Sequence, residues 1–382
     1  MKSKHILIVG GGIGGLTAAL ALQRRGFRAS VYERAEQFRE IGAGLIITAN
    51  ARHALGDLGV DDSLAHRSSC VPVIHGCDYA TGAIQGSTKN SDIEALWGAA
   101  TLQVHRGDLH DVLKEAVAAN DPDALHAGCE FAQLRQDESG VTATFTNGQT
   151  AQGDALIGAD GNTSAVRSFV FPGEATAFNG QVAYRALIPR ALAPKQVNEL
   201  QMAMYAGPGR YMLFYSLSGG SIVNLIGCGR ATAWEAEGWS IPAMNEEFEA
   251  AYADFAPHLI DLIRAIPRGD LFKWGLRDRE PLATWVAGHV AMLGDAAHPM
   301  TPFLGQGACI AIEDGLVLGR AFAATNSVGE ALQRYELARR TRGTNAQLWS
   351  REEGLALQDP KIPQRPAAAR GLLDYNPVTA PI

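Results

Sequence analysis

Apolar and polar positions near the start of the chain alternate in the pattern of a strand, a helix and a second strand. Residues 6–9 are a short aliphatic run typical of a buried parallel strand. Apolar residues then recur at helical spacing over residues 16–21, and Gly26 is a typical helix end. Residues 29–32 predict the second strand. The pattern therefore predicts a β-α-β unit with parallel strands.

A glycine-rich turn lies between the first predicted strand and the helix. Residues 10–15 read Gly-Gly-Gly-Ile-Gly-Gly and match G-x-G-x-x-G at positions 10, 12 and 15. Such glycines allow a tight turn and the close approach of a pyrophosphate, and the helix N-terminus offers free N–H groups to it. Glu33, after the second strand, can accept hydrogen bonds from ribose hydroxyls. The unit predicts dinucleotide binding, with these candidate contacts: Gly10, Gly12, Ile13, Gly14, Gly15, Glu33 and Arg34.

The pattern changes in the middle of the chain. Residues 182–226 hold four short strand-like runs separated by turn sequences, which predict an antiparallel sheet. An amphipathic helix is expected at about 243–264, and residues 313–353 look helical. From residue 360 onward the chain is rich in Pro and Ala, and we expect it to wrap over the surface.

Composition narrows the class of protein. The chain has 382 residues, of which 47% are hydrophobic, and a net charge of −7. This length predicts one very large domain or two interleaved ones. No apolar run approaches a membrane span, and no cluster of Lys and Arg suits nucleic acid or an acidic membrane. The five cysteines form no C-x-x-C pair, so neither a zinc site nor a disulfide framework is predicted. The first apolar run is too short for a secretory signal, so we expect a soluble, cytoplasmic protein without a metal.

Two later motifs complete a family pattern. Residues 160–167, Asp-Gly-Asn-Thr-Ser-Ala-Val-Arg, match D-G-x-x-S-x-x-R. Residues 294–299, Gly-Asp-Ala-Ala-His-Pro, are followed by Pro-Phe-Leu-Gly-Gln-Gly at 302–307. With these motifs in this order, the chain resembles the single-component FAD-dependent aromatic hydroxylases. This group is typified by para-hydroxybenzoate hydroxylase and includes salicylate, 3-hydroxybenzoate and 6-hydroxynicotinate monooxygenases.

The resemblance implies an α/β fold. A Rossmann-like FAD-binding domain of the GR2 type is expected, with an interleaved antiparallel β-sheet substrate domain and C-terminal helices. The FAD-binding domain would comprise residues 1–70, 100–178 and 280–355. The substrate domain would comprise residues 71–99 and 179–279, and a C-terminal extension would follow at 356–382.

The resemblance also implies a tightly but non-covalently bound FAD. Glu33 would contact the adenosine ribose, Arg106 the ribityl and pyrophosphate region, and Asp295 the ribityl chain. Asp160 and Arg167 match residues linked to both FAD and the nicotinamide cofactor, although Arg167 could instead be an internal ion-pair partner. The isoalloxazine end would lie along Pro302, Gly305, Gln306, Gly307 and Ala308. There is no second G-x-G-x-x-G. The resemblance implies that NADH or NADPH binds only transiently on the surface of the FAD domain, and the choice between them stays open.

The implied chemistry is hydroxylation with O2. NAD(P)H would reduce FAD, and a flavin C4a-hydroperoxide would transfer oxygen to a small aromatic or heteroaromatic substrate, in a monomer or homodimer. Alternation along the predicted strand places Tyr211 and Tyr215 on one face, so both could point into the substrate pocket. With an ordinary pKa near 10, a tyrosine is a better hydrogen-bond partner than a base at neutral pH. His298, beside the flavin loop, is the third catalytic candidate, with a structural role as the alternative.

The sequence departs from its relatives at the pocket. A histidine commonly stands where Tyr211 aligns in the hydroxybenzoate and heteroaromatic-acid branches, and this chain lacks it. Ile46 and Phe303 make the expected pocket more apolar than a small polar acid would need. Two further hypotheses therefore stay open: a flavoprotein of this fold with another redox reaction, such as a reductase or halogenase, and a non-catalytic flavin-binding module.

Overall fold

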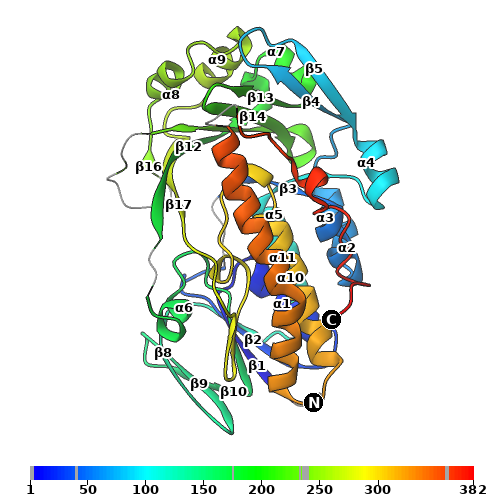
Figure 1. Ribbon diagram of the computed structural model, residues 1–382, viewed down its shortest axis with the longest axis vertical. Helices are drawn as coiled ribbons and strands as arrows, with labels where there is room; N and C mark the ends of the chain where they lie inside the picture. The colour runs from blue at the N-terminus through cyan, green and yellow to red at the C-terminus, as the bar shows by residue number, and fades with distance from the viewer. Residues whose placement is uncertain (1–3, 39–41, 174–175, 232–233, 235–240, 358–360) are drawn as a thin grey trace.

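Two large sheets, whose strands are interleaved along the sequence, build the molecule (Figure 1). The computed structural model describes residues 4–38, 42–173, 176–231, 234, 241–357 and 361–382. The parallel sheet lies in the lower half of Figure 1 and the antiparallel sheet in the upper half, with long helices running between them. Within the described residues, no helix combines the length and apolar character needed to span a bilayer.

The predicted β-α-β unit is confirmed and lies at the centre of a six-stranded sheet. Strands β1 (His5–Val9) and β2 (Arg28–Tyr32) pair in parallel, and α1 (Ile13–Gln23) connects them. Next to β1 lies β11 (Ala155–Gly158), again in parallel. The sheet is completed by β19 (Val290–Met292), β18 (Val286–Ala287) and β7 (Leu125–His126), in the order β18-β19-β11-β1-β2-β7.

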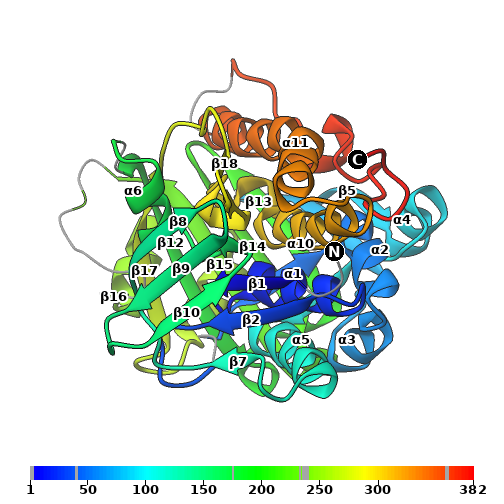
Figure 2. The same ribbon diagram turned by 90° about the horizontal axis from the view of Figure 1, so that it is seen from below.

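Three helices stack on this sheet one above another. Figure 2 shows α10 (Gly307–Ala323) lying against α1, and α11 (Val328–Ala356) lying against α10. Helix α5 (Arg106–Asn120) also packs against α1. The two long helices confirm the helical region expected from 313 to about 353, with a short break after Ala323. Smaller elements surround this layer: α2 (Ala49–Asp57), α3 (Asp61–Arg67), α6 (Ala165–Val170), and the β3 (Gly44–Ile47) and β6 (Leu102–His105) pair.

The second sheet has eight strands and is almost wholly antiparallel, as predicted. Its order is β16-β17-β12-β15-β14-β13-β4-β5. The strands are β16 (Ile241–Pro242), β17 (Leu271–Asp278), β12 (Ala177–Pro189), β15 (Ile222–Arg230), β14 (Arg210–Leu217), β13 (Met202–Gly207), β4 (Val73–Asp78) and β5 (Ile84–Lys89). The exception is the parallel pairing of β13 with β4. Two strands from residues 73–89 thus join a sheet built mainly from residues 177–278; the exact domain boundaries stay a prediction.

The prediction of one continuous helix at about 243–264 is wrong. The structure has two helices there, α8 (Asn245–Ala251) and α9 (Pro257–Arg264). Pro257 occupies the first turn of α9, where its missing N–H is tolerated, whereas inside a continuous helix it would remove a hydrogen bond. The predicted apolar face is nevertheless buried, since Phe248, Phe255 and Leu259 all lie in the core of the antiparallel sheet domain.

The remaining elements cover the edges. A three-stranded sheet of β8 (Phe131–Asp137), β9 (Gly140–Phe145) and β10 (Thr150–Gly153) lies beside the parallel sheet. Helices α4 (Asn90–Trp97) and α7 (Lys195–Leu200) flank the antiparallel one. The C-terminal segment, residues 361–382, returns over α10 and α11, with Leu372 fully buried.

Candidate active site

A cavity of about 740 Å³ lies between the two sheets. One wall is made by residues that follow the carboxyl ends of the parallel strands β1, β2, β11 and β19. The other wall is made by side chains of β12, β14, β15 and β17 of the antiparallel sheet. In open α/β sheets, ligands bind at the carboxyl ends of the strands, so this is where the fold places a ligand.

The glycine-rich turn forms one end of the cavity. Gly10 has φ +109°, and a Cβ there would lie 2.3 Å from the carbonyl oxygen of Ala159, so only glycine fits. The Glu33 carboxylate accepts hydrogen bonds from the N–H groups of Gly11 (2.7 Å) and Ala35 (3.0 Å). Because no side chain caps α1 at Gly12, its first N–H groups are left for a ligand in the cavity.

Polar side chains line the middle of the cavity. Asp295 follows β19 and projects into the open space; burial raises the pKa of its carboxyl, while His298 and Arg106 lower it. Asp160 follows β11, and burial raises the pKa of its carboxyl. The Asp160 carboxylate accepts hydrogen bonds from the Ser164 hydroxyl (2.5 Å) and the Val166 N–H (3.1 Å), so it also stabilises the start of α6. Arg106 begins α5 and lines the same space.

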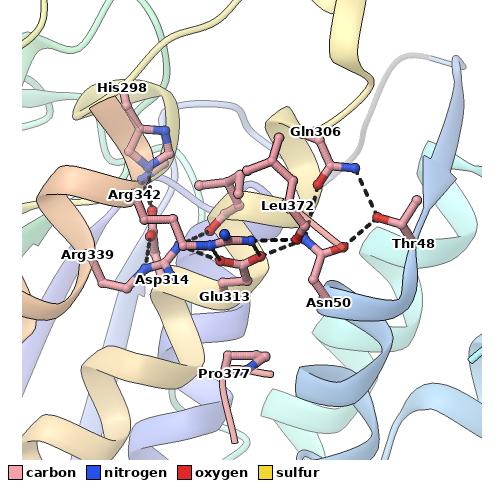
Figure 3. A network of polar contacts seen from close by, with 12 residues as sticks. Thr48, Asn50, His298, Gln306, Glu313, Asp314, Arg339, Arg342, Leu372 and Pro377 are labelled. Carbon is pink, nitrogen blue, oxygen red and sulfur yellow. Dashed lines mark hydrogen bonds and ion pairs between the residues drawn. The ribbon is translucent and has the colours of Figure 1, made fainter. Parts of the chain in front are cut away.

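The opposite end of the cavity is the turn into α10. Gly305 has φ +63°, and α10 starts at Gly307 without a side-chain cap. The cavity is lined here by Pro302, Gly305, Gln306, Gly307 and Ala308. The Gln306 side chain turns away from α10: its Oε1 accepts from Asn50 (3.0 Å) and its Nε2 donates to Thr48 (3.0 Å), as Figure 3 shows. The turn is thereby held while its backbone faces the cavity.

Both candidate tyrosines face the cavity, as their alternation along the strand predicted. Tyr211, Leu213 and Tyr215 of β14 line it together. Burial raises the pKa of the Tyr215 hydroxyl to about 12 and that of Tyr211 well above its ordinary value. The Tyr211 hydroxyl accepts a hydrogen bond from the Cys228 thiol (3.4 Å), and its ring meets Phe303 edge-on at 5.8 Å. At neutral pH both tyrosines are therefore neutral hydrogen-bonding groups.

His298 is not placed where a catalytic residue would be. It is fully buried, and its Nε2 is paired with the Asp314 carboxylate on α10 at 2.5 Å, while its ring packs on Trp285. It is not among the residues that line the cavity. The structure therefore favours the structural alternative: His298 holds the turn that carries Asp295 against α10.

Arg167 likewise lies behind the cavity wall. It is buried, and its Nη1 donates to the carbonyl oxygens of Ala296 (3.2 Å) and Ala297 (3.3 Å). It does not line the cavity. The geometry supports a role in positioning the Asp295 turn in place of the expected direct contact with FAD or the nicotinamide.

Comparisons with known proteins agree with this geometry. The model of the FAD binding domain family matches residues 3–350. The chain belongs to this family. The 3-hydroxybenzoate 6-hydroxylase of Polaromonas naphthalenivorans (strain CJ2) is 34% identical over 91% of this chain and 87% of its own length. The 6-hydroxynicotinate 3-monooxygenase of Bordetella bronchiseptica (strain ATCC BAA-588 / NCTC 13252 / RB50) is 30% identical over 90% and 89%.

A solved structure confirms the fold. Klebsiella pneumoniae HpxO, in complex with FAD and uric acid, superposes with a TM-score of 0.85 at 28% identity, covering 98% of this chain and 93% of that one. A salicylate hydroxylase substrate complex gives a TM-score of 0.82 at 23% identity, covering 98% and 94%. The expected α/β fold with its FAD-binding domain is therefore confirmed.

The cavity of this FAD-binding protein fits its cofactor. Uncapped helix N-termini reach the cavity at Gly12 and at Gln306, and they suit a pyrophosphate and an electron-poor ring, respectively. The acidic side chains between them suit a polyhydroxyl chain. The cavity is lined by Gly10, Gly12, Ile13 and Gly14 of the glycine turn, and by Glu33 and Arg34; their contact with FAD stays a prediction. Gly15 lies just behind it, where a Cβ would meet the Gly10 carbonyl oxygen at 2.0 Å.

His110 and Trp274 are among the cavity-lining residues that sequence reasoning did not identify. His110 of α5 supports the glycine turn, with its Nε2 at 2.8 Å from the carbonyl oxygen of Gly11. Trp274 of β17 lines the opposite wall. Neither belongs to a recognisable motif, and each reaches the site only because distant segments are brought together, so no local signal could have found them.

Proposed function

We propose that this protein is an FAD-dependent monooxygenase that uses NAD(P)H and O2 to hydroxylate a small aromatic or heteroaromatic compound. One observation carries the proposal: the dinucleotide cradle at the ends of the parallel strands is continuous with a pocket walled by aromatic and aliphatic side chains of the antiparallel sheet. A flavin held in the cradle and a ring held in the pocket would share one enclosed space. The named relatives that hydroxylate hydroxybenzoate and hydroxynicotinate support the same reaction class.

The chain's own residues would bind and orient the reactants. FAD supplies the reactivity toward O2. The adenosine end of FAD would be held by Glu33 and the glycine turn. Its middle would be held by Asp295, Asp160 and Arg106. The α10 N-terminus would lie at its ring, where the helix dipole stabilises negative charge.

The antiparallel sheet would bind the substrate ring. Leu213, Ile226, Trp274 and Leu276 give the pocket apolar walls that exclude water, which favours oxygen transfer over loss of H2O2. Tyr215 and Tyr211 remain protonated at neutral pH and would orient a substrate hydroxyl by hydrogen bonding.

The reductant would bind transiently. The sequence holds no second G-x-G-x-x-G, so we propose that NADH or NADPH approaches the FAD domain without a separate nucleotide-binding domain.

A turnover screen tests the proposal. The purified yellow protein would be mixed with single aromatic compounds, and stimulated oxidation of NADH and of NADPH would be measured together with the product mass. A gain of one oxygen atom supports the proposal. A gain of chlorine or of two hydrogens would identify another reaction on the same fold, and an absence of ligand-dependent turnover would indicate a flavin-binding module.

A further inference from the structure

We infer that Asn224 is a positioning residue that sets where a substrate ring lies relative to the flavin. The inference rests on the proposed function and adds a residue to its machinery. Asn224 lies in β15 and is fully buried, between the apolar residues Val223 and Leu225 of the same strand. A buried polar side chain at such a position costs stability unless hydrogen bonds compensate for it.

Only one side of the Asn224 amide is used. Its Oδ1 accepts a hydrogen bond from the Gly44 N–H at 3.0 Å, in a buried contact. Because a backbone N–H can only donate, this contact identifies the oxygen of the amide. The Nδ2 group is buried and has no hydrogen-bond partner within the described residues. The fold thus leaves buried donors unpaired to keep one acceptor here, and such exceptions to local rules are typical of functional positions.

The acceptor holds the start of β3, a strand that lines the cavity. Gly44 is the first residue of β3, and Leu45 and Ile46 line the cavity beside it. The Ala43 carbonyl oxygen accepts from the Arg106 N–H at 2.8 Å, so the peptide group between Ala43 and Gly44 is held from both sides. One side is the substrate sheet. The other is the start of α5, where Arg106 lines the proposed FAD site.

The other end of β3 is connected to the turn that we place at the flavin ring. Thr48, directly after β3, accepts a hydrogen bond from Gln306 Nε2 at 3.0 Å (Figure 3). The Cys309 thiol of α10 donates to the Ile46 carbonyl oxygen at 3.4 Å. Strand β3 is therefore a short bridge, with the substrate sheet at one end and the ring end of the cofactor site at the other.

The contact also lies beside a residue that would orient the substrate. Asn224 stands directly opposite Tyr215 in the pairing of β15 with β14, so both side chains lie on the same face of the sheet. A Cβ on Gly44 would lie 2.7 Å from Asn224 Cγ and 2.7 Å from the Tyr215 hydroxyl, so the three groups meet only because residue 44 is glycine. Loss of the acceptor would leave the Gly44 N–H unpaired and let β3 shift relative to Tyr215. The substrate ring and the flavin would then be less well aligned.

Replacement of the Asn224 side chain tests the inference. Asn224→Leu has a similar shape and removes the acceptor, whereas Asn224→Asp keeps an oxygen that can accept from Gly44. Asn224→Ala removes the acceptor without adding bulk and replaces the leucine variant if the latter does not fold. Asn198→Leu is the matched control: the Asn198 amide, in α7 of the same domain, also has one side without a partner within the described residues, but it does not line the cavity. FAD content and thermal unfolding verify that each variant is folded.

Product yield is the first measurement. In Asn224→Leu we expect hydroxylated product per NAD(P)H oxidised to fall about threefold or more, with the balance as H2O2. FAD affinity should stay within about threefold of the parent, because the cofactor contacts are not removed. Asn224→Asp should recover most of the yield. Asn198→Leu should change stability alone.

Hydrogen exchange is the second measurement, and it needs no turnover. On the FAD-loaded protein, amides of residues 43–48 should exchange about tenfold faster in Asn224→Leu than in the parent, because the Gly44 N–H has lost its acceptor. Amides of residues 303–307 should also exchange faster, since β3 is tied to that turn. Asn224→Asp should retain the protection of both segments.

The outcomes distinguish the inference from the proposed function. An unchanged product yield in a folded Asn224→Leu, or a loss that Asn224→Asp does not restore, would overturn the positioning role. So would faster exchange that is confined to residues 43–48, or absent. If the parent forms no oxygenated product, the monooxygenase is rejected, and exchange at the two segments alone decides whether Asn224 holds the bridge.

Discussion

Packing fixes the two tyrosine side chains that face the pocket. Tyr215 is 1% exposed, and its ring lies so close to Gly44 that a Cβ there would meet the tyrosine hydroxyl at 2.7 Å. Tyr211 is fixed by Phe303 and Cys228. Because packing holds these rings on the sides away from the cavity, their hydroxyls have little freedom to follow a misplaced substrate. They are suited to orienting a ligand, which is a geometric task, and unsuited to removing a proton.

Removal of the Tyr215 hydroxyl tests this orienting role. We expect Tyr215→Phe to retain FAD and the fold, because the ring that packs in the core is kept. The fraction of NAD(P)H oxidation that yields hydroxylated product should fall. A less well oriented ring reacts more slowly with the activated oxygen, so more of that oxygen is lost as H2O2. The measurement is hydroxylated product and H2O2 formed per NAD(P)H oxidised. Tyr211→Phe is the companion variant; identical ratios and substrate affinities in all three proteins would make both tyrosines packing residues.

Asp295 carries a second prediction at this scale. If its carboxylate accepts hydrogen bonds from the ribityl chain, Asp295→Ala should weaken FAD binding by roughly 1.5–3 kcal/mol, about ten- to a hundredfold. The reason is the loss of a charge-assisted hydrogen bond in the cavity. FAD affinity would be measured by fluorescence titration of the apoprotein. Asp270→Ala, on an exposed loop, controls for loss of a negative charge; equal affinities in the two variants would leave Asp295 only a local backbone role.

These site residues differ in how far the sequence could identify them. Glu33, Asp160 and Asp295 each follow a short apolar run and a glycine-containing motif, so their positions at strand ends could be predicted from local pattern. His298 and Arg167 belong to the same motifs but point backward into the protein, and no local pattern reports the direction of a side chain. Arg185 and Trp274 meet across two strands separated by a long stretch of chain, a contact that only the sheet pairing creates.

At the scale of elements, the contact between α1 and α10 sets the geometry of the cofactor site. Both helices begin at the cavity without side-chain caps, so their relative position fixes the distance between the two cavity ends. Gly315 and Gly319 of α10 face α1 so closely that a Cβ would lie 2.7 Å from the Ala18 nitrogen or 2.8 Å from the Ala21 carbonyl oxygen. The neighbouring atoms are backbone and cannot yield without moving a helix.

Alanine at this contact should therefore destabilise the fold. We expect Gly319→Ala to lower the free energy of unfolding by about 1–3 kcal/mol through overpacking, and to weaken FAD binding because the helix ends shift. Gly56→Ala is the matched control: Gly56 lies in α2, and a Cβ there meets nothing within 4 Å. The control should be neutral or stabilising by up to about 1 kcal/mol, since alanine favours helix. Denaturant unfolding measures both, and a stabilised Gly319→Ala would contradict the close contact.

Elements were predictable where the pattern is local. The β-α-β unit, the antiparallel sheet and the long C-terminal helices follow from periodicity alone. The break between α8 and α9 was missed because the apolar face continues across it, although Pro257 marks the start of the second helix. The parallel pairing of β4 with β13 was not predicted either, because it joins residues more than 120 positions apart and no turn sequence signals it.

Across the whole molecule, a buried network of charges connects the cavity to the far end of the chain (Figure 3). Asp314 of α10 accepts from His298, Arg339 and the Gly294 N–H, and thus holds the turn before Asp295. Burial by itself would raise the pKa of the Asp314 carboxyl, but His298 and Arg339 lower it below its ordinary value. The Asp314 carboxylate therefore connects α10, α11 and the turn that carries Asp295.

Glu313 makes the parallel connection toward the other end of the cavity. It accepts from Asn50 (2.6 Å), which also holds Gln306, and it is paired with Arg339 and Arg342 of α11 at 2.7 Å. Arg342 in turn donates to the Leu372 carbonyl oxygen (2.8 Å) in the C-terminal segment. The sequence predicted that this segment wraps the surface. Its connection to the Gln306 turn depends on the packing of four elements and has no sequence signature.

Arg342 is the residue that joins the C-terminal segment to this network, and its replacement tests whether the connection supports cofactor binding. Arg342→Met removes one partner, itself only 15% exposed, of the fully buried Glu313 carboxylate, while Arg339 keeps that carboxylate paired. We therefore expect a loss of about 1.5–3 kcal/mol of stability without collapse of the fold. FAD should also dissociate faster, because Glu313 becomes less restrained in holding Asn50 and, through it, the Gln306 turn. Thermal unfolding and the rate of flavin fluorescence recovery measure the two effects. Arg334→Met, which loses only an exposed ion pair with Glu330 on the same helix, should leave both unchanged. If the two variants release FAD at the same rate, the network stabilises the helices alone and the cofactor turn is held by its own local contacts.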